Sequence, residues 1–175
     1  LLGCHKAGAE ETVLELSAEL GAIPVMTGDS SNQKRINLDS FGRSWGWKRK
    51  GMSKAWRKLM IKQASLQEIN VAQLSGSLLW QNIKETSNSL LNFTKDCSLD
   101  VIDISIGPLA NVECSWHPAT LWVGIGCERD TSESIIDRAL SVTLEKANLA
   151  EEAIAGIATI DIKSNENSLI SFAKR

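Results

Sequence analysis

The chain has 175 residues, a formal net charge of −2 and 43% hydrophobic residues, enough to bury one good core or two small ones. No apolar run approaches the roughly 18–20 residues that a membrane helix needs, and the first residues do not resemble a signal peptide. We therefore expect a cytoplasmic α/β protein that does not insert into a membrane. Because the chain starts without Met, inside an apolar pair, we expect it to be a fragment.

The first residues have the pattern of a βαβ unit. Leu1-Leu2 looks like the end of a strand, and apolar residues at spacings of three and four predict a helix from Ala9 to Leu20, ended by Gly21. Residues 22–27 predict a short buried strand parallel to the first. His5 lies in the loop between strand and helix, where α/β folds present ligand-contacting groups, and the pattern leaves a catalytic and a structural role equally open.

A basic, tryptophan-rich stretch follows. Between Lys34 and Gln63 the chain carries ten basic residues against one acid, with three of its six tryptophans. Three interpretations stay open: the solvated face of an amphipathic helix over residues 52–64, a surface for a flat polycarboxylated small molecule, or a grip on single-stranded nucleic acid.

The rest of the middle part is less regular. Residues 71–74 indicate a strand, and Val101–Ile106 alternates apolar and polar residues as a half-buried strand should. His117 precedes Pro118, so we expect it in a loop. The overall expectation is an α/β fold in which two small βαβ-type modules with parallel strands are joined by an irregular segment.

The far end repeats the βαβ pattern. It predicts a strand over 120–125, a helix over 131–147, a strand over 157–162 and a short terminal helix after Glu166. Asp130 is a natural N-cap for the first helix, with Glu133 three residues later as in a capping box.

The glycine turn after the first of these strands contains Gly124 and Gly126. Arg129 stands where a dinucleotide fingerprint needs its third glycine, and no Gly-Lys-Ser/Thr is present, so Rossmann and Walker phosphate sites are excluded. Two interpretations remain: a tightly capped surface turn, or backbone N–H groups at a helix N-terminus that bind an anion or a developing oxyanion. Arg129, Thr131 and Ser132 would add donors in the second case.

The cysteines offer no metal motif. Cys4, Cys97, Cys114 and Cys127 are scattered without a C-x-x-C pair. We expect free thiols and no metal site.

The stretches WVGIGCERDTSESIIDRAL and ATIDIKSNENSLISFA resemble the carboxy-terminal domain of the cobalamin biosynthesis protein G (CbiG) family, with its G-x-G-C-x-R-x-T-S and D-x-K-x-x-E motifs. The first 33 residues resemble the end of the same family's amino-terminal domain, although Cys4 and Glu10 depart from its loop pattern. The middle most resembles the form fused to a precorrin-3B C17-methyltransferase. The resemblance implies three units: the end of an amino-terminal domain over 1–33, a central domain over 34–116, and the start of a CbiG/CobE-type carboxy-terminal domain over 117–175.

What the resemblance implies is a hydrolase that opens the δ-lactone of cobalt-precorrin-5A and releases acetaldehyde. Its substrate is an anionic cobalt-tetrapyrrole that carries the cobalt itself, so no cofactor of the protein's own and no nucleic acid are expected. The alternative is a non-catalytic tetrapyrrole-binding module that acts with a fused methyltransferase.

The resemblance also implies site residues. His5 or Glu166 would be the general base and Lys163 an electrostatic partner, although Lys163 and Glu166 could equally form a local ion pair. The expected substrate-binding residues are Gly124, Gly126, Arg129, Thr131, Ser132, Arg49 and Trp47. We expect the glycine turns and the basic segment to form one concave surface for the ring.

Overall fold

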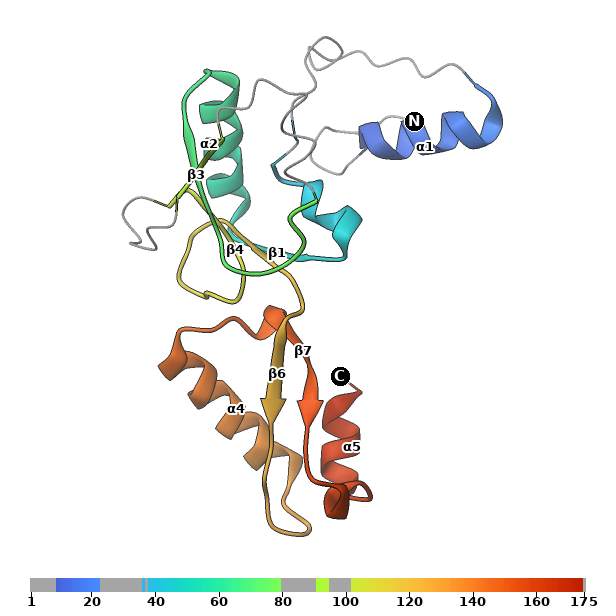
Figure 1. The fold of residues 1–175 in the computed structure, drawn as a ribbon, viewed down its shortest axis with the longest axis vertical. Coiled ribbons are helices and arrows are strands. Elements are labelled where there is room, and N and C mark those ends of the chain that lie inside the picture. Colours follow the sequence, from blue (N-terminus) through green and yellow to red (C-terminus); the bar gives the residue numbers. More distant parts are fainter. Residues whose placement is uncertain (1–8, 23–35, 37, 80–90, 95–101, 175) are drawn as a thin grey trace.

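A computed structural model describes residues 9–22, 36, 38–79, 91–94 and 102–174, with only the backbone for 9–14. Apart from the first helix, the described elements form two parts, one above the other in Figure 1. We call residues 36–117 the central part and residues 121–174 the C-terminal part. The domain boundaries expected after residues 33 and 116 stay predictions.

The first helix, α1, spans Ala9–Leu20, as the apolar spacing predicts. Gly21 follows with a φ of 61°, and the N–H of Ala22 donates to the carbonyl of Ser17 at 2.9 Å. This is the left-handed helix end that glycine adopts without a Cβ penalty. The strand predicted at the start of the chain, nearly all of the one predicted after Gly21, and His5 lie outside the described residues.

The central part contains a five-stranded mixed sheet in the order β1-β5-β4-β2-β3. Its strands are β1 (Lys48–Lys50), β2 (Ile69–Gln73), β3 (Leu91–Phe93), β4 (Ile104–Ile106) and β5 (Ser115–His117). β1 runs antiparallel to β5, and the other pairs are parallel. The expectation of an irregular middle segment is therefore wrong. Most of these strands have three residues, too few for a periodic signal in the sequence.

The helix α2 (Ser53–Ala64) confirms the amphipathic pattern. Its buried residues are Ala55, Trp56 and Leu59, and the cations on the other side, Lys54, Arg57 and Lys58, are exposed. The basic stripe of α2 is thus exposed to solvent, which agrees with its interpretation as the solvated face of an amphipathic helix.

Two tryptophans of the basic stretch, Trp47 and Trp56, belong to the core together with Trp116 of β5. Trp56 and Trp116 are 2% and 0% exposed, and their rings meet edge to face with centroids 5.8 Å apart. The indole N–H of Trp116 donates to the carbonyl of Leu38, and that of Trp56 to the carbonyl of Lys50, both at 3.0 Å. Buried indoles with satisfied N–H groups stabilise a core and leave no ring face for a ligand.

Strand β4 is more buried than its alternating sequence predicts. All three of its residues are buried, and Ser105 is 0% exposed. Because β4 lies between β2 and β5 and both its faces are covered, polar and apolar positions are equally enclosed. His117 corrects a second expectation: it lies in β5, 1% exposed, and not in a loop.

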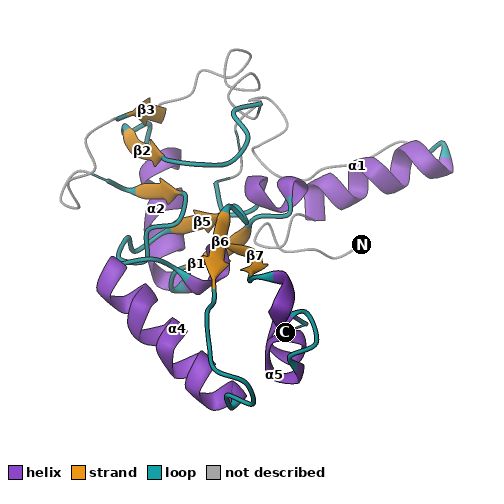
Figure 2. Cartoon of the chain, turned by 60° about the horizontal axis from the view of Figure 1, so that its bottom comes forward, coloured by secondary structure: helices purple, strands orange, loops and turns teal. Residues whose placement is uncertain are grey.

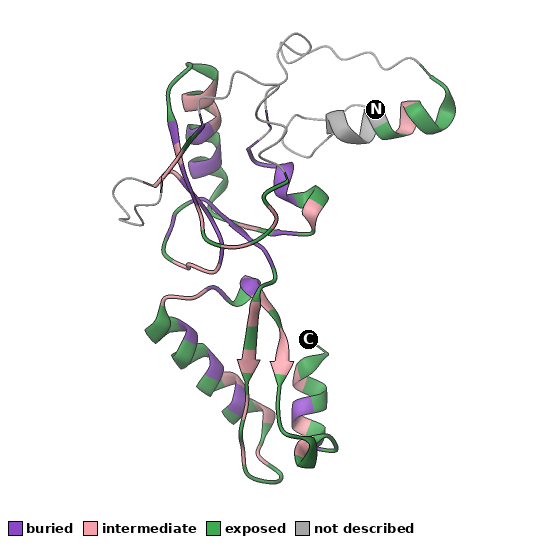
Figure 3. Cartoon of the chain, in the orientation of Figure 1, coloured by how far each residue is buried: buried purple, intermediate pink, exposed green. Residues whose placement is uncertain are grey.

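The C-terminal part is the parallel βαβ unit that the sequence predicts. β6 (Leu121–Gly124) and β7 (Ile154–Ala158) pair in parallel, joined by α4 (Glu133–Ala147) and the 3-10 turn η4 (Glu151–Ala153). In both Figure 1 and Figure 2, α4 lies beside β6 and the last helix, α5 (Asn167–Ala173), beside β7. Figure 3 shows a stripe of buried residues along α4, which comprises Ile136, Leu140 and Leu144.

Two details of this unit differ from expectation. The N-cap of α4 is Ser132 and not Asp130, whose φ of 60° is left-handed, so the predicted capping box is wrong. β7 ends at Ala158, the residue paired with the last residue of β6, Gly124, and residues 161–163 form a 3-10 turn, η5 (Asp161–Lys163). Ile160 and Ile162, which made residues 157–162 look like a buried strand, are 67% and 68% exposed.

Backbone hydrogen bonds join the two parts. The N–H of Ala110 donates to the carbonyl of Asn148 at 3.0 Å, and that of Ala150 to the carbonyl of Pro108 at 2.7 Å. The ammonium of Lys50 donates to Glu152 at 3.0 Å across the same junction. Within the described ranges, no helix is long and apolar enough to cross a membrane.

Candidate functional site

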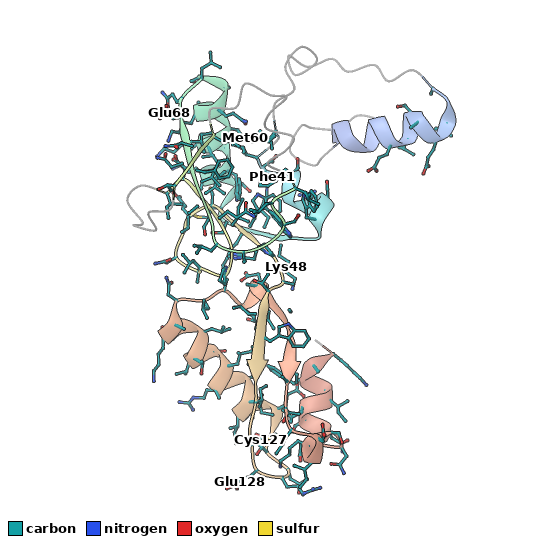
Figure 4. All side chains as sticks on the ribbon, viewed as in Figure 1. Phe41, Lys48, Met60, Glu68, Cys127 and Glu128 are labelled. Carbon is teal, nitrogen blue, oxygen red and sulfur yellow. The ribbon has the colours of Figure 1, made fainter. Side chains whose placement is uncertain are left out.

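The parallel strands β6 and β7 end at the same edge of their sheet, and the two segments that carry the motif residues, 125–132 and 159–166, leave from that edge. In parallel α/β sheets ligands bind beyond the carboxyl ends of the strands. Cys127 and Glu128, labelled in Figure 4, mark this end of the molecule. The described chain thus places two of the sequence motifs together.

Two hydrogen bonds tie the two segments to each other, and a third ties the first segment to the last residue of β7. The N–H of Ile125 donates to the carbonyl of Ala158 at 2.9 Å, and the hydroxyl of Thr159 donates to the carbonyl of Ile125 at 2.8 Å. Further out, the N–H of Asp130 donates to Oε1 of Glu166 at 2.8 Å. The carboxylate of Glu166 therefore accepts the Asp130 N–H, one of the backbone donors that we expected to be available for a bound anion.

Glu166 and Lys163 lie together as well. Nζ of Lys163 is 3.7 Å from Oε2 of Glu166, and the two side chains are 15% and 5% exposed. Low exposure strengthens such a pair, because water screens it less than it screens a pair at the surface. The local ion pair that the spacing allowed is present.

A pocket of about 230 Å³ opens beside the glycine turn. It is lined by Val123, Gly124, Ile125, Gly126, Cys127, Thr131, Ile135, Ile136, Ala139, Leu140 and Thr143. A Cβ atom on Gly124 or on Gly126 would meet nothing within 4 Å, so the backbone there is open to an approaching group. Pockets for drug-sized ligands measure about 300–1,000 Å³. This one fits one substituent of a large ligand and not a whole macrocycle.

The remaining predicted donors lie on the same turn. Arg129 is exposed, and the Thr131 hydroxyl donates to the carbonyl of Glu128 at 2.8 Å. The hydroxyl of Ser132 lies 3.0 Å from that of Ser134. Arg129 and Ser132 remain open to solvent, whereas Thr131 is half-buried in the wall of the pocket.

Arg49 and Trp47 lie elsewhere. The guanidinium of Arg49 donates to the carbonyl of Asp39 at 3.3 Å and lies over the ring of Trp56, 5.4 Å from its centroid. Trp47 is 8% exposed, with its ring edge to face against Phe41 at 6.0 Å. Trp47 belongs to the core of the central part and its ring offers no platform for a ligand, whereas Arg49 is half-buried at the edge of that core.

The basic helix and the glycine turn do not share a surface. Met60, on α2, and Glu128, on the turn, are labelled at opposite ends of the molecule in Figure 4. The expectation of one concave surface that joins the cationic stretch with this turn is wrong for the described residues, because the length of β6 and β7 separates the turn from the central part. His5, the other predicted base, lies outside them.

Thr159 was not among the residues singled out from the sequence, and His117, expected in a loop, is a buried residue of β5. Thr159 binds the glycine turn, but the predicted strand ran through it and hid its place in a loop. Nδ1 of the buried His117 lies 2.7 Å from the carbonyl of Gly107, while its Nε2 has no hydrogen-bond partner. Only a carbonyl faces Nδ1, so that nitrogen carries the proton.

Burial lowers the pKa of His117 from its ordinary value, against the hydrogen bond to Gly107 and the Glu152 carboxylate, which raise it. The ring is therefore neutral at physiological pH. Among the side chains that the structure describes, no group of three or more His, Cys, Asp or Glu could hold a metal ion.

Comparison with known proteins finds a match to a protein family in the C-terminal part. Residues 121–175 match the family model described as "Cobalamin synthesis G C-terminus". Over 189 aligned residues, the whole chain is 29% identical to a cobalt-precorrin-5A hydrolase of Priestia megaterium, of which the alignment covers 50%. The chain thus spans about half the length of this curated relative. No solved structure matches the chain.

The chain is therefore homologous, at moderate identity, to a protein of cobalamin biosynthesis. The match of residues 121–175 includes both motif segments that the fold brings to one edge of the β6–β7 sheet.

Proposed function

We propose that this chain is part of a hydrolase of cobalamin biosynthesis, which opens the δ-lactone of cobalt-precorrin-5A with release of acetaldehyde. The observation that carries the proposal is the contact between the two motif segments, made by the Asp130 N–H and the Glu166 carboxylate at 2.8 Å. It lies in the stretch that matches the cobalamin synthesis family, and similarity to the hydrolase of Priestia megaterium extends over the whole chain.

Lactone opening requires a base that activates water and donors where negative charge develops on the lactone oxygen. We assign the base to His5 or Glu166, the two candidates from the sequence, with Lys163 as the electrostatic partner. The donors are Arg129, Thr131 and Ser132, together with the backbone at Gly124 and Gly126, where the space beside the chain is open.

The substrate we propose is an anionic cobalt-tetrapyrrole, and its cobalt is cargo rather than a resident metal. A pocket of about 230 Å³ accepts one substituent of the ring, such as the lactone edge, and leaves the macrocycle outside. Because Trp47 lies in the core of the central part and Arg49 is engaged with Asp39 and Trp56 there, we assign them no contact with the same edge of the ring. We place the protein in the cytoplasm, bound to neither membrane nor nucleic acid.

The test is to incubate the purified protein with the lactone-bearing intermediate and to assay acetaldehyde. The proposal expects release that depends on the protein and falls strongly in the His5→Ala variant or in the Glu166→Ala variant. A Lys54→Ala variant, altered on the exposed face of α2, is the matched control and keeps its activity. No acetaldehyde from the unaltered protein, with binding of the intermediate retained, would reject hydrolysis.

That result would favour a second function, a tetrapyrrole-binding module that acts with a precorrin-3B C17-methyltransferase. One observation favours it: Oε1 of Glu166 is engaged with a backbone N–H and Oε2 faces Lys163, so the described site holds no free carboxylate at this position. A titration in which binding of the intermediate is measured by visible absorbance separates this function from that of a protein that neither binds nor hydrolyses the intermediate.

A further inference from the structure

The carboxylate of Glu166 connects two turns that belong to different helices. Glu166 is the N-cap of α5, and its own N–H donates to the carbonyl of Lys163 at 3.1 Å. Its carbonyl accepts the N–H of Ile170 at 3.0 Å. The backbone of Glu166 is thus fixed in the first turn of α5, while its side chain reaches across to the turn before α4.

The receiving residue, Asp130, has an unusual backbone. Its φ of 60° is left-handed, a conformation that disfavours residues with a Cβ atom. The hydrogen bond from its N–H to Oε1 of Glu166, at 2.8 Å, is charge-assisted, and the side chain of Glu166 is only 5% exposed. A bond of this kind offsets the backbone strain and holds the turn in the one conformation seen here.

The turn that Glu166 holds is a wall of the pocket. Thr131, the residue after Asp130, lines it together with Gly126 and Cys127. A shift at Asp130 would therefore move the pocket wall directly, whereas the Glu166 carboxylate itself is not among the lining residues. A general base must come within about 2.6–3.2 Å of the atom whose proton it takes, or reach it through one water. Oε1 of Glu166 accepts a hydrogen bond from a backbone N–H, and Oε2 lies 3.7 Å from Nζ of Lys163.

We propose that Glu166 is a positioning residue, which fixes the 125–132 turn through the Asp130 N–H, and is not the base of the reaction. The kinetic part of this proposal rests on the proposed function, and it leaves His5 as the base among the two candidates. The structural part, that this one acceptor holds the turn, stands without it.

Two substitutions at the same position separate the roles. Glu166→Gln keeps an oxygen that accepts the Asp130 N–H but cannot take a proton as a base. Glu166→Ala removes both. Thr159→Val is the matched control, because it removes a different bond between the same segments, the one to the carbonyl of Ile125 at 2.8 Å.

Two measurements are made on the purified protein: amide hydrogen exchange at Asp130, and the dependence of kcat/KM for acetaldehyde release on pH. Glu166→Gln should keep the exchange protection and at least about one tenth of kcat/KM, with an unshifted pH profile. Glu166→Ala should speed exchange at Asp130 about tenfold, as expected for the loss of one buried hydrogen bond. In Thr159→Val, protection at Asp130 should persist.

A loss of about 10²–10⁴-fold in kcat/KM for Glu166→Gln, with Asp130 still protected, would overturn the proposal and make Glu166 the base. Unchanged exchange in Glu166→Ala would overturn the structural part. If Glu166→Ala does not fold, Glu166→Gln still decides between the two roles. If the unaltered protein releases no acetaldehyde, the proposed function fails, and the exchange measurements still decide whether Glu166 holds the turn.

Discussion

A Cβ atom on Gly42 would lie 2.5 Å from Cε3 of Trp116, whose side chain is 0% exposed. Gly42 is buried in the 3-10 turn η3 (Phe41–Trp45), and Phe41 packs edge to face on the same ring at 5.5 Å. Gly42→Ala should therefore lower the free energy of unfolding by about 1–3 kcal/mol, the usual cost of overpacking a core. Urea unfolding followed by tryptophan fluorescence measures it, and an unchanged midpoint would contradict the packing described.

Gly124 offers the opposite case. A Cβ there meets nothing within 4 Å, and Gly124 is not among the described glycines with positive φ. Gly124→Ala should change the free energy of unfolding by no more than about 0.5 kcal/mol. If the open backbone receives the substrate, Gly124→Val should lower kcat/KM without unfolding the protein. Full activity in Gly124→Val would show that the substrate does not approach there.

Asp130 tests the strained turn. Because its φ is 60°, Asp130→Val should lower the free energy of unfolding by about 1–3 kcal/mol, since a β-branched residue is an outlier in this region. Asp130→Gly should be tolerated, because glycine adopts that conformation freely. Arg129→Val, at the exposed neighbouring position without a positive φ, is the control. Equal effects of the two valine substitutions would argue against the left-handed turn.

His117 should make the fold sensitive to acid. Burial lowers its pKa in the folded state, so below the ordinary value of 6.5 the unfolded chain binds the proton more readily than the folded one. The stabilising effect of a neutral His117 is present at pH 7.5 and is lost as the pH falls. Urea unfolding at pH 7.5 and 5.5 should therefore show a loss of stability.

In His117→Gln that loss should shrink, since the Gln amide still donates to Gly107 and does not titrate. His5→Gln serves as the control for the other histidine. A pH dependence in His117→Gln identical to that of the unaltered protein would assign it to other groups.

The thiols should differ in reactivity. Burial, with the Glu113 carboxylate, raises the pKa of Cys114 to about 11, so at pH 8 only about one thiol in a thousand is the reactive thiolate. Cys127 is half-buried and lines the pocket at the glycine turn. With Cys4 and Cys97 replaced by Ser, iodoacetamide at pH 8 should label Cys127 well before Cys114, as read by peptide mass spectrometry. Prior labelling of Cys114 would contradict its burial.

Much of the C-terminal part was predictable because it is local. α4 and α5 are amphipathic, and the Gly124 turn stands between a strand and a helix, so spacing alone indicates both elements and their order. The predicted strand over 157–162 failed at its end, because IATIDI has strand-like apolar residues up to Ile162 but no partner backbone beyond Ala158. Strand ends depend on pairing, which spacing does not contain.

The central sheet was not predictable for the same reason. β5 consists of Ser115, Trp116 and His117, and the pattern of these three residues does not predict a fully buried strand. Its neighbours in the sheet are β4, whose paired residues stand ten positions earlier, and β1, whose paired residues stand at least 65 positions earlier, and neither pairing can be read from the three residues themselves. Trp47 was misjudged for a different reason: its neighbours along the chain, Phe41 and Trp45, pack against its ring, and the many cations nearby suggested a ligand platform instead.

Local spacing and motif chemistry were enough to predict the βαβ pattern of the C-terminal part and the amphipathic helix α2, and to single out the glycine turn and Glu166 as the residues of interest. Contacts between distant segments settled the rest: that Glu166 reaches the Asp130 N–H, 36 residues away in the chain, and that the basic helix lies at the other end of the molecule from the glycine turn. Periodicity reports which face of an element avoids water. Which element covers that face depends on the packing of the whole chain, because apolar surface is buried by any segment that fits against it, however far away that segment stands in the sequence.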